Sequence, residues 1–246
     1  MAQSQDVRLS VIIPAYNEQR RLPRTLAQAA AYLSRQPYRS EVIVVNDGST
    51  DDTEPLVRLG GGGSVAVTLL RHPDGLNHGK GASVRRGILA ARGDYRLFMD
   101  ADNSTTLDQV ERFWPFFEAG ADVVIGSRAL RGAVIVRRQP IVKEIAGRTG
   151  NLLVRMLAVP GISDTQAGFK MFTAAAAKGI FPRLTIDRWG YDVEVLAIAR
   201  SLQCRICEVP ITWRNFSGSK VTAGTYFEVI GDIWRIRRNL RAGLYR

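Results

Sequence analysis

The sequence predicts an α/β fold in which a mainly parallel, Rossmann-like sheet carries helices on both faces. In the first half of the chain, short apolar and β-branched segments alternate with segments of helical periodicity. The apolar segments are hydrophobic at nearly every position, which is typical of strands buried on both faces of a parallel sheet. Three of them end in polar clusters, and parallel strands place such clusters at the sheet edge where ligands bind.

The order of the elements follows from the hydrophobic pattern. The first strand is expected at 9–14, where an apolar run is stopped by Pro14. A helix is expected at 22–33, because apolar residues recur there on one helical face. The remaining strands are expected at 41–45, 65–70, 95–99 and 122–126, and the remaining helices at 51–59, 82–91 and 107–118.

The composition favours an anionic partner. The chain of 246 residues has 34 Lys and Arg against 23 Asp and Glu, a net charge of +11. Such a balance favours nucleotide phosphates or an acidic membrane surface. Nucleic acid is not an expected partner, because no recognition motif accompanies the charge. Cys204 and Cys207 form an isolated C-x-x-C without a second pair, so a zinc or redox site is not expected either.

The chain shows no sign of crossing a membrane. No apolar run reaches the roughly 18–20 residues that span a bilayer. Residues 1–8 are polar and lack the apolar stretch of a signal peptide. We therefore expect a cytoplasmic protein that binds peripherally to the cytoplasmic face of a membrane.

Two segments combine basic and apolar residues in the manner of an interfacial helix, 135–159 and 226–244. In the second, a set of apolar residues recurs at helical spacing: Phe227, Ile230, Ile233, Trp234, Leu240 and Leu244. A basic amphipathic helix with Trp and Phe is suited to adsorb to an anionic membrane surface. The alternative is a helix that packs on the core and leaves a solvated basic face.

The segment at 95–102 carries the strongest sign of chemistry. A buried strand ends there in Asp100-Ala101-Asp102, which places two hard oxygen ligands at the rim of the sheet. Such oxygens suit Mg²⁺ or Mn²⁺ carried by a diphosphate. The alternative is a turn and helix cap before Leu107.

Several strings resemble family 2 glycosyltransferases with the GT-A, or nucleotide-diphospho-sugar transferase, fold. They lie at 11–18 (VIIPAYNE), 44–52 (VVNDGSTDD), 77–81 (NHGKG), 100–102 (DAD), 164–170 (DTQAGFK), 188–194 (RWGYDVE) and 213–220 (WRNFSGSK). The similarity covers about 9–220 and implies one GT-A domain at 1–225, followed by a basic amphipathic helix at 226–246.

The later strings look most like dolichyl-phosphate β-glucosyltransferases, which use UDP-glucose. The resemblance therefore implies an inverting, metal-dependent transfer of a hexose to a polyprenyl or dolichyl phosphate. GDP-mannose-dependent mannosyltransferases acting on the same lipid, and family 2 enzymes acting on a glycan alcohol, remain open. The choices of UDP against GDP and of glucose against mannose also stay open.

The resemblance assigns roles to particular residues. Asp102, Asp192 and Arg128 are the catalytic candidates; Asp192 is a weak base or a positioning group, because a lipid phosphate has no proton to lose. Asp100 and Asp102 would hold the metal. The nucleotide-sugar site would consist of Pro14, Tyr16, Asn17, Glu18, Asp47, Gly48, Lys80, Asp100, Ala101, Asp164 and Gln166. The acceptor or its phosphate would meet Arg128, Trp189, Ser219 and Lys220.

Overall fold

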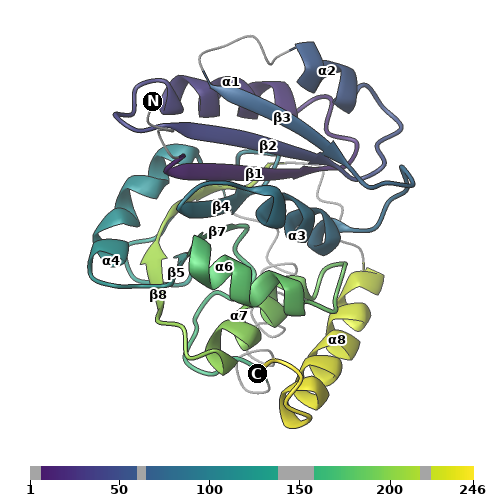
Figure 1. Ribbon diagram of the computed structural model, residues 1–246, viewed down its shortest axis with the longest axis vertical. Helices are drawn as coiled ribbons and strands as arrows, with labels where there is room; N and C mark the ends of the chain where they lie inside the picture. The colour runs from purple at the N-terminus through teal and green to yellow at the C-terminus, as the bar shows by residue number, and fades with distance from the viewer. Residues whose placement is uncertain (1–6, 60–64, 138–157, 217–222) are drawn as a thin grey trace, which may run out of the picture.

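The computed structural model describes residues 7–59, 65–137, 158–216 and 223–246, and within them seven strands form one sheet. Figure 1 shows these strands side by side. In spatial order they are β3 (Ala66–Arg71), β2 (Ser40–Asn46), β1 (Leu9–Ala15), β4 (Tyr95–Met99), β7 (Phe169–Thr173), β5 (Val123–Ser127) and β8 (Ile206–Pro210). A second, two-stranded sheet pairs β6 (Val134–Arg137) with β9 (Thr212–Arg214).

The large sheet is parallel except for one strand. β1, β2, β3 and β4 pair in parallel, as do β5 and β8. β7 lies between β4 and β5 and runs antiparallel to both. The predicted fold class is confirmed. The antiparallel direction of β7 also determines which segment reaches the edge of the sheet. Because β7 runs the other way, its amino end lies at the edge where β4 and β5 end, so the segment before it joins that rim.

The inner strands of the large sheet are buried on both faces, as their uniform hydrophobicity predicted, whereas the edge strands β3 and β8 are only partly buried. Ile12 and Phe98 point into one core layer, whereas Val11 and Leu97 point into the other. On the first face lie α3 (Lys80–Ala90), α6 (Ala174–Ile180), the 3₁₀ turn η2 (Phe181–Arg183), α7 (Tyr191–Ser201) and α8 (Ala223–Arg241). On the second lie α1 (Leu22–Leu33), α2 (Thr53–Leu59), the 3₁₀ helix η1 (Leu107–Arg112) and α4 (Trp114–Glu118).

Two expected elements differ from the structure. The first strand does not stop at Pro14; β1 continues to Ala15, with Pro14 opposite Val45 of β2. Pairing of β1 with β4 ends at Ile12, so β1 has a partner on only one side there and the missing N–H of the proline is tolerated. The single helix expected at 107–118 is divided into η1 and α4, because Pro115 lies in the first turn of α4 and has no N–H to continue the helix.

The C-terminal helix also differs from its expected form. α8 begins at Ala223, before the predicted boundary at 226, and packs against α7. The apolar residues do not share one exposed face: Ile233 is buried in the core together with Ile236, whereas Trp234 and Leu244 are 61% and 62% exposed. The side of α8 that carries Ile233 and Ile236 therefore packs on the core, as the alternative interpretation of this helix expected. Residues 138–157, most of the other predicted interfacial segment, lie outside the described residues.

None of the helices in the described ranges combines the length and hydropathy needed to cross a membrane.

Candidate active site

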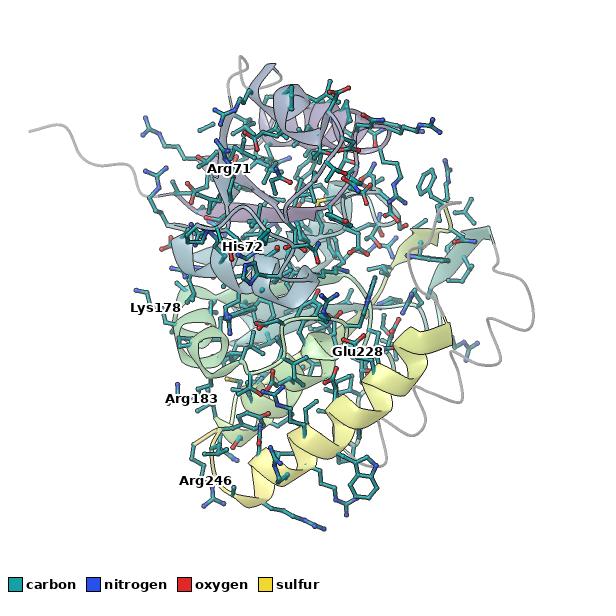
Figure 2. All side chains as sticks on the ribbon, turned by 90° about the vertical axis from the view of Figure 1, so that its right-hand side faces the viewer. Arg71, His72, Lys178, Arg183, Glu228 and Arg246 are labelled. Carbon is teal, nitrogen blue, oxygen red and sulfur yellow. The ribbon has the colours of Figure 1, made fainter. Side chains whose placement is uncertain are left out.

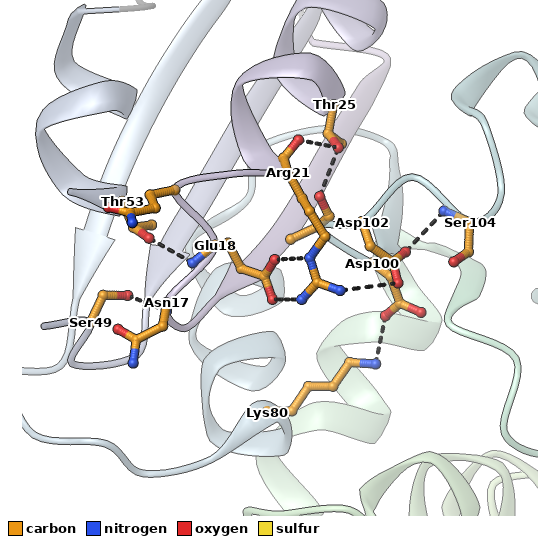
Figure 3. A network of polar contacts seen from close by, with 12 residues as sticks. Asn17, Glu18, Arg21, Thr25, Ser49, Thr53, Lys80, Asp100, Asp102 and Ser104 are labelled. Atoms are coloured by element: carbon orange, nitrogen blue, oxygen red, sulfur yellow. Dashed lines mark hydrogen bonds and ion pairs between the residues drawn. The ribbon is translucent and has the colours of Figure 1, made fainter. Parts of the chain in front are cut away.

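The three polar clusters that follow β1, β2 and β4 meet at one rim of the sheet, as predicted. These strands are adjacent and parallel, so their carboxyl ends coincide. The amide of Asp47 donates to the carbonyl of Ala15 over 2.8 Å and joins the first two clusters directly. Figure 3 shows the first and third clusters facing each other across the rim.

The loop after β1 is held by the loop after β2. The amide of Asn17 donates to Ser49 Oγ over 2.9 Å, and Asn17 Oδ1 accepts from the amide of Thr50 over 2.8 Å. The amide of Glu18 donates to Thr53 Oγ1 over 2.7 Å. These bonds support Asn17 in the left-handed region, with φ of 51°. The predicted site residue Asn17 therefore shapes the loop that follows β1.

Arg21 joins the first cluster to the third, and sequence reasoning missed it. Its guanidinium donates two hydrogen bonds to Glu18, of 2.6 and 2.5 Å, and lies 3.9 Å from Asp102 Oδ2 (Figure 3). Burial lowers the pKa of Arg21, but Glu18 and the two aspartates outweigh it and raise that pKa above its usual value. Glu18 thus faces an arginine rather than the open rim. Its spacing of three residues from Arg21, at the start of a helix, was the available signal.

Asp100 and Asp102 form a carboxylate pair with cations on either side. Lys80 Nζ lies 2.6 Å from Asp100 Oδ1, and Asp102 Oδ1 accepts from the amide of Ser104 over 2.9 Å. Burial and the negative charge of Asp100 raise the pKa of Asp102. Gly168 packs against Asp100, where a Cβ would stand 2.1 Å from Oδ2. Only glycine lets the segment before β7 approach this carboxylate so closely.

The acid pair fits the predicted divalent cation. Burial is the main cause of the raised pKa of Asp102 and the charge of Asp100 the second, so a cation bound between the two carboxylates would offset both the lost hydration and the repulsion. In the described ranges no group of three or more His, Cys, Asp or Glu could hold a metal ion on its own. Mg²⁺ commonly takes one or two carboxylates and completes its shell with phosphate and water. Asp100 and Asp102 would therefore hold the ion jointly with a diphosphate.

Asp47 holds the loop before α3. One carboxylate oxygen accepts from the amide of His78 over 2.8 Å and the other from Asn77 Nδ2 over 2.9 Å, while the amide of Gly79 lies within 3.2 Å of both. His72 Nε2 is 3.3 Å from the same group. Asp47, a predicted nucleotide-sugar-site residue, could therefore contact a nucleotide only if the nucleotide replaced one of these donors. Sequence reasoning missed His72, which no motif includes.

Arg128 and Asp164 are brought together from β5 and the segment before β7. Both carboxylate oxygens of Asp164 accept from the guanidinium, over 2.7 and 2.8 Å, and Arg128 stacks on Trp213 at 5.5 Å. Burial raises the pKa of Asp164, but Arg128 outweighs it and holds the pKa below its usual value. The pairing orients Arg128 and weighs against direct sugar binding by Asp164. Gln166 beside it is exposed.

Asp192 is buried in an ion pair with Lys170. Lys170 is 0% exposed, and its Nζ bonds to Asp192 Oδ1 and donates to the carbonyl of Ala167 over 2.6 Å. Burial lowers the pKa of Lys170. Since its carboxylate already faces a cation, Asp192 is better suited to positioning than to proton abstraction. The lysine thereby links the string at 164–170 to the string at 188–194.

The other predicted site residues lie as follows. Tyr16 is 38% exposed at the rim. Gly48 has a φ of 71°, and a Cβ there would stand 2.7 Å from the backbone of Asn77. The carbonyl of Ala101 accepts from Thr25 Oγ1 over 2.7 Å. Pro14 lies in β1 and Trp189 is half-buried, whereas Ser219 and Lys220 lie outside the described residues.

Comparison with known proteins places the chain in a family. The model of glycosyl transferase family 2 matches residues 10–176, more than half of the chain. A dolichyl-phosphate beta-glucosyltransferase of Trichomonas vaginalis is 36% identical over 98% of this chain and 74% of its own length. One from Dictyostelium discoideum is 37% identical over 98% and 77%. Glucosyl-3-phosphoglycerate synthase from Mycobacterium tuberculosis, solved with Mn²⁺, UDP-glucose and phosphoglyceric acid, matches the fold with a TM-score of 0.68 at 18% identity, over 97% of this chain and 80% of that one.

Proposed function

This chain belongs to glycosyltransferase family 2, and from that premise we propose that it transfers glucose from UDP-glucose to a polyprenyl or dolichyl phosphate. The product would be a β-linked lipid-phosphate sugar, in keeping with the β-glucosyl transfer for which the similar enzymes are named. The observation that carries the proposal is the carboxylate pair Asp100 and Asp102 at the sheet rim, with Lys80 and Arg21 beside it.

Each part of the rim would serve the donor. When bound, Mg²⁺ or Mn²⁺ supplies positive charge that stabilises the departing UDP. Lys80 is held by Asp100 and would add a cation at the diphosphate. The interlocked loops after β1 and β2 would enclose the base and ribose, with Tyr16 exposed beside them.

The acceptor side favours an acceptor that is already ionised. Asp192 is paired with Lys170, and a phosphate nucleophile needs no strong base. Arg128 is fixed by Asp164 and presents a guanidinium at the same rim for the incoming phosphate.

A panel of nucleotide sugars tests the proposal. With a short polyprenyl phosphate and Mn²⁺, we expect UDP-glucose to be consumed and UDP released, with a β-glucosyl lipid phosphate identified by mass spectrometry and NMR. Consumption of GDP-mannose instead would make the chain a mannosyltransferase. Transfer to a glycan alcohol but not to the phosphate would refute the assigned acceptor.

We also propose that the outer side of α8 binds an anionic membrane surface, where a lipid phosphate would be found. Arg235, Arg238 and Arg241 are exposed, as is Trp234 between the first of them and the buried Ile233. Figure 2 views the molecule from the side on which α8 lies, with Glu228 near its first turns and Arg246 beyond its end. Cations with an exposed indole suit adsorption to anionic lipid.

Replacing these three arginines by glutamine should weaken binding to vesicles of phosphatidylserine and phosphatidylcholine by about a hundredfold, since each basic residue near such a surface adds roughly 1 kcal/mol. Vesicle sedimentation measures the partition coefficient. The matched control replaces Arg24, Arg35 and Arg39, which are exposed on or just after α1, toward the other end of the molecule in Figure 1. Equal loss in both triple variants would show that net charge, and not α8, governs adsorption.

A further inference from the structure

The helix α8 reaches the predicted acceptor segment at 188–194 through Asp232, a half-buried carboxylate. Asp232 lies against the backbone of Gly190, directly before the first turn of α7. A Cβ on residue 190 would stand 2.3 Å from Asp232 Oδ2 and 2.5 Å from its Cβ, so only glycine admits this contact. Asp232 Oδ2 is buried and has no hydrogen-bond partner among the described residues. A carboxylate in such a place is retained at a cost in desolvation.

The segment that Asp232 touches is held elsewhere too. The carbonyl of Asp187 accepts from the amide of Ala82 in α3 over 3.0 Å, and its carboxylate pairs with Arg85 at 3.0 Å. Only residues 188–190 lie between this anchor and α7, which carries Asp192 in its first turn. Trp189, a predicted acceptor residue, is in that short span. Asp232 is therefore placed to fix the backbone conformation of the short segment that leads into Asp192.

Residues at and just after the end of α8 hydrogen-bond to Glu194 in α7. Tyr245 donates to Glu194 over 2.6 Å, and Glu194 also accepts from the amides of Thr185 and Ile186 over 2.9 and 2.8 Å. Asn239 Nδ2 donates to the Tyr245 hydroxyl over 3.1 Å. Both carboxylate oxygens of Glu194 therefore have hydrogen-bond donors, which indicates a structural role. Asp232 is different, because its Oδ2 has no hydrogen-bond partner in the part of the chain that the structure describes.

We propose that ionised Asp232 is a positioning residue for the acceptor: it holds residues 188–192 in the arrangement that binds the lipid phosphate. The inference rests on the proposed function for the identity of the acceptor. The negative charge faces the amide of Gly190 and the amino end of α7, where backbone N–H groups favour an anion. Protonation removes that attraction and loosens the segment.

The charges around Asp232 make its protonation testable. Burial and Glu228 raise the pKa of Asp232 to about 6, and Glu194 of α7 adds to the increase, whereas the Gly190 amide and Arg235 lower it. Glu228 and Arg235 are both exposed on α8. Changing either one alters the charge felt by Asp232 without touching Gly190. Because Arg235 also lies on the proposed membrane-binding side of α8, the assay uses a short polyprenyl phosphate without vesicles.

The first measurement compares Asp232→Asn with the wild type at pH 7.5. We expect the acceptor KM to rise about tenfold, the effect of losing one charge-assisted contact, with the donor KM and kcat nearly unchanged. Hydrogen exchange of the amides at 188–192 should be faster in the variant, and this readout needs no substrate. Unchanged acceptor KM together with unchanged exchange would overturn the inference while leaving the proposed transfer intact.

The second measurement follows the acceptor KM from pH 5 to 8. The lipid phosphate itself titrates near pH 6. The pH at which the acceptor KM changes on the acidic side therefore does not by itself identify Asp232 as the titrating group. Glu228→Gln should move the limb contributed by Asp232 to lower pH, and Arg235→Gln should move it to higher pH. In the Asp232→Asn background both shifts should vanish. Shifts that persist in that background would assign the limb to another group and refute the proposal.

Thermal stability distinguishes a positioning role of Asp232 from a contribution to the stability of the whole fold. The folded-state pKa of Asp232 is raised, so the native state binds more protons than the unfolded state between about pH 4 and pH 6 and loses stability as pH rises through that window. Asp232→Asn should therefore melt higher than the wild type at pH 8, with a smaller difference at pH 5. A lower Tm at pH 8 would mean that ionised Asp232 stabilises the whole fold and not only the arrangement of residues 188–192, contrary to the proposal.

Discussion

Replacing Asp102 by alanine should lower kcat/KM by about a thousandfold and abolish the Mn²⁺-dependent increase in Tm produced by UDP. The reason is electrostatic: the variant loses one of the two carboxylates that would hold the cation at the leaving diphosphate, and such charge stabilisation is commonly worth 10²–10³ in rate or more. Thermal shift with UDP, with and without Mn²⁺, measures the binding, and steady-state kinetics measures the rate.

The loss of activity should not be accompanied by a loss of stability. Burial and the charge of Asp100 raise the pKa of Asp102, so ionised Asp102 costs the folded state some stability at neutral pH. Without ligands, Asp102→Ala should therefore melt no lower than the wild type at pH 7.5. The control is Asp108→Ala, because Asp108 is exposed in η1, six residues after Asp102. This variant should retain its activity and its response to metal. A fully active Asp102→Ala variant would remove the metal site from the proposal.

Lys170→Met should be the most destabilising single change at the rim, at about 3–5 kcal/mol. The substitution preserves much of the side-chain volume but leaves Asp192 buried without its cation, and breaking a buried pair from one side carries a penalty of this size. Urea unfolding at pH 7.5 measures the change. The matched control is Lys178→Met on α6, where the lysine is exposed (Figure 2).

The double variant identifies the cause of that loss. Adding Asp192→Asn to Lys170→Met removes the unpaired charge, so part of the stability should return, and the double-mutant cycle should report a coupling of about 1–3 kcal/mol. Additive effects, or a Lys170→Met variant as stable as Lys178→Met, would contradict the ion pair as the source of stability. Transfer to a phosphate acceptor should survive Asp192→Asn better than transfer to any alcohol.

The sequence predicted the site because its signals are local. Uniformly apolar strands imply a sheet covered on both faces, and polar residues that follow β1, β2 and β4 must meet when those strands are parallel. Asp100 and Asp102 were found this way, and the seven-stranded sheet confirms the arrangement. Errors were local as well. Pro14 was given its usual role as a strand stop, although the strand lacks a second neighbour there.

The partners of the charged groups could not be predicted in the same way. Asp164 and Asp192 appeared as ligand-binding candidates, yet the structure pairs them with Arg128 and Lys170. Both pairs depend on β7, which inserts antiparallel between β4 and β5 and carries its neighbouring segment to the rim. Nothing in the residues around Phe169 specifies that position, because an apolar strand fits any interior place in a sheet equally well.

The sequence by itself determined the fold class, the family and the acid pair at 100 and 102. Only the tertiary structure decided which cation faces each carboxylate, and that α8 presses Asp232 onto Gly190. Hydrophobic period and turn chemistry act between residues close in the chain, so they can be recognised in the sequence. Ion pairing and close packing join residues 20 to 50 or more positions apart, and these depend on how the strands and helices are ordered in space.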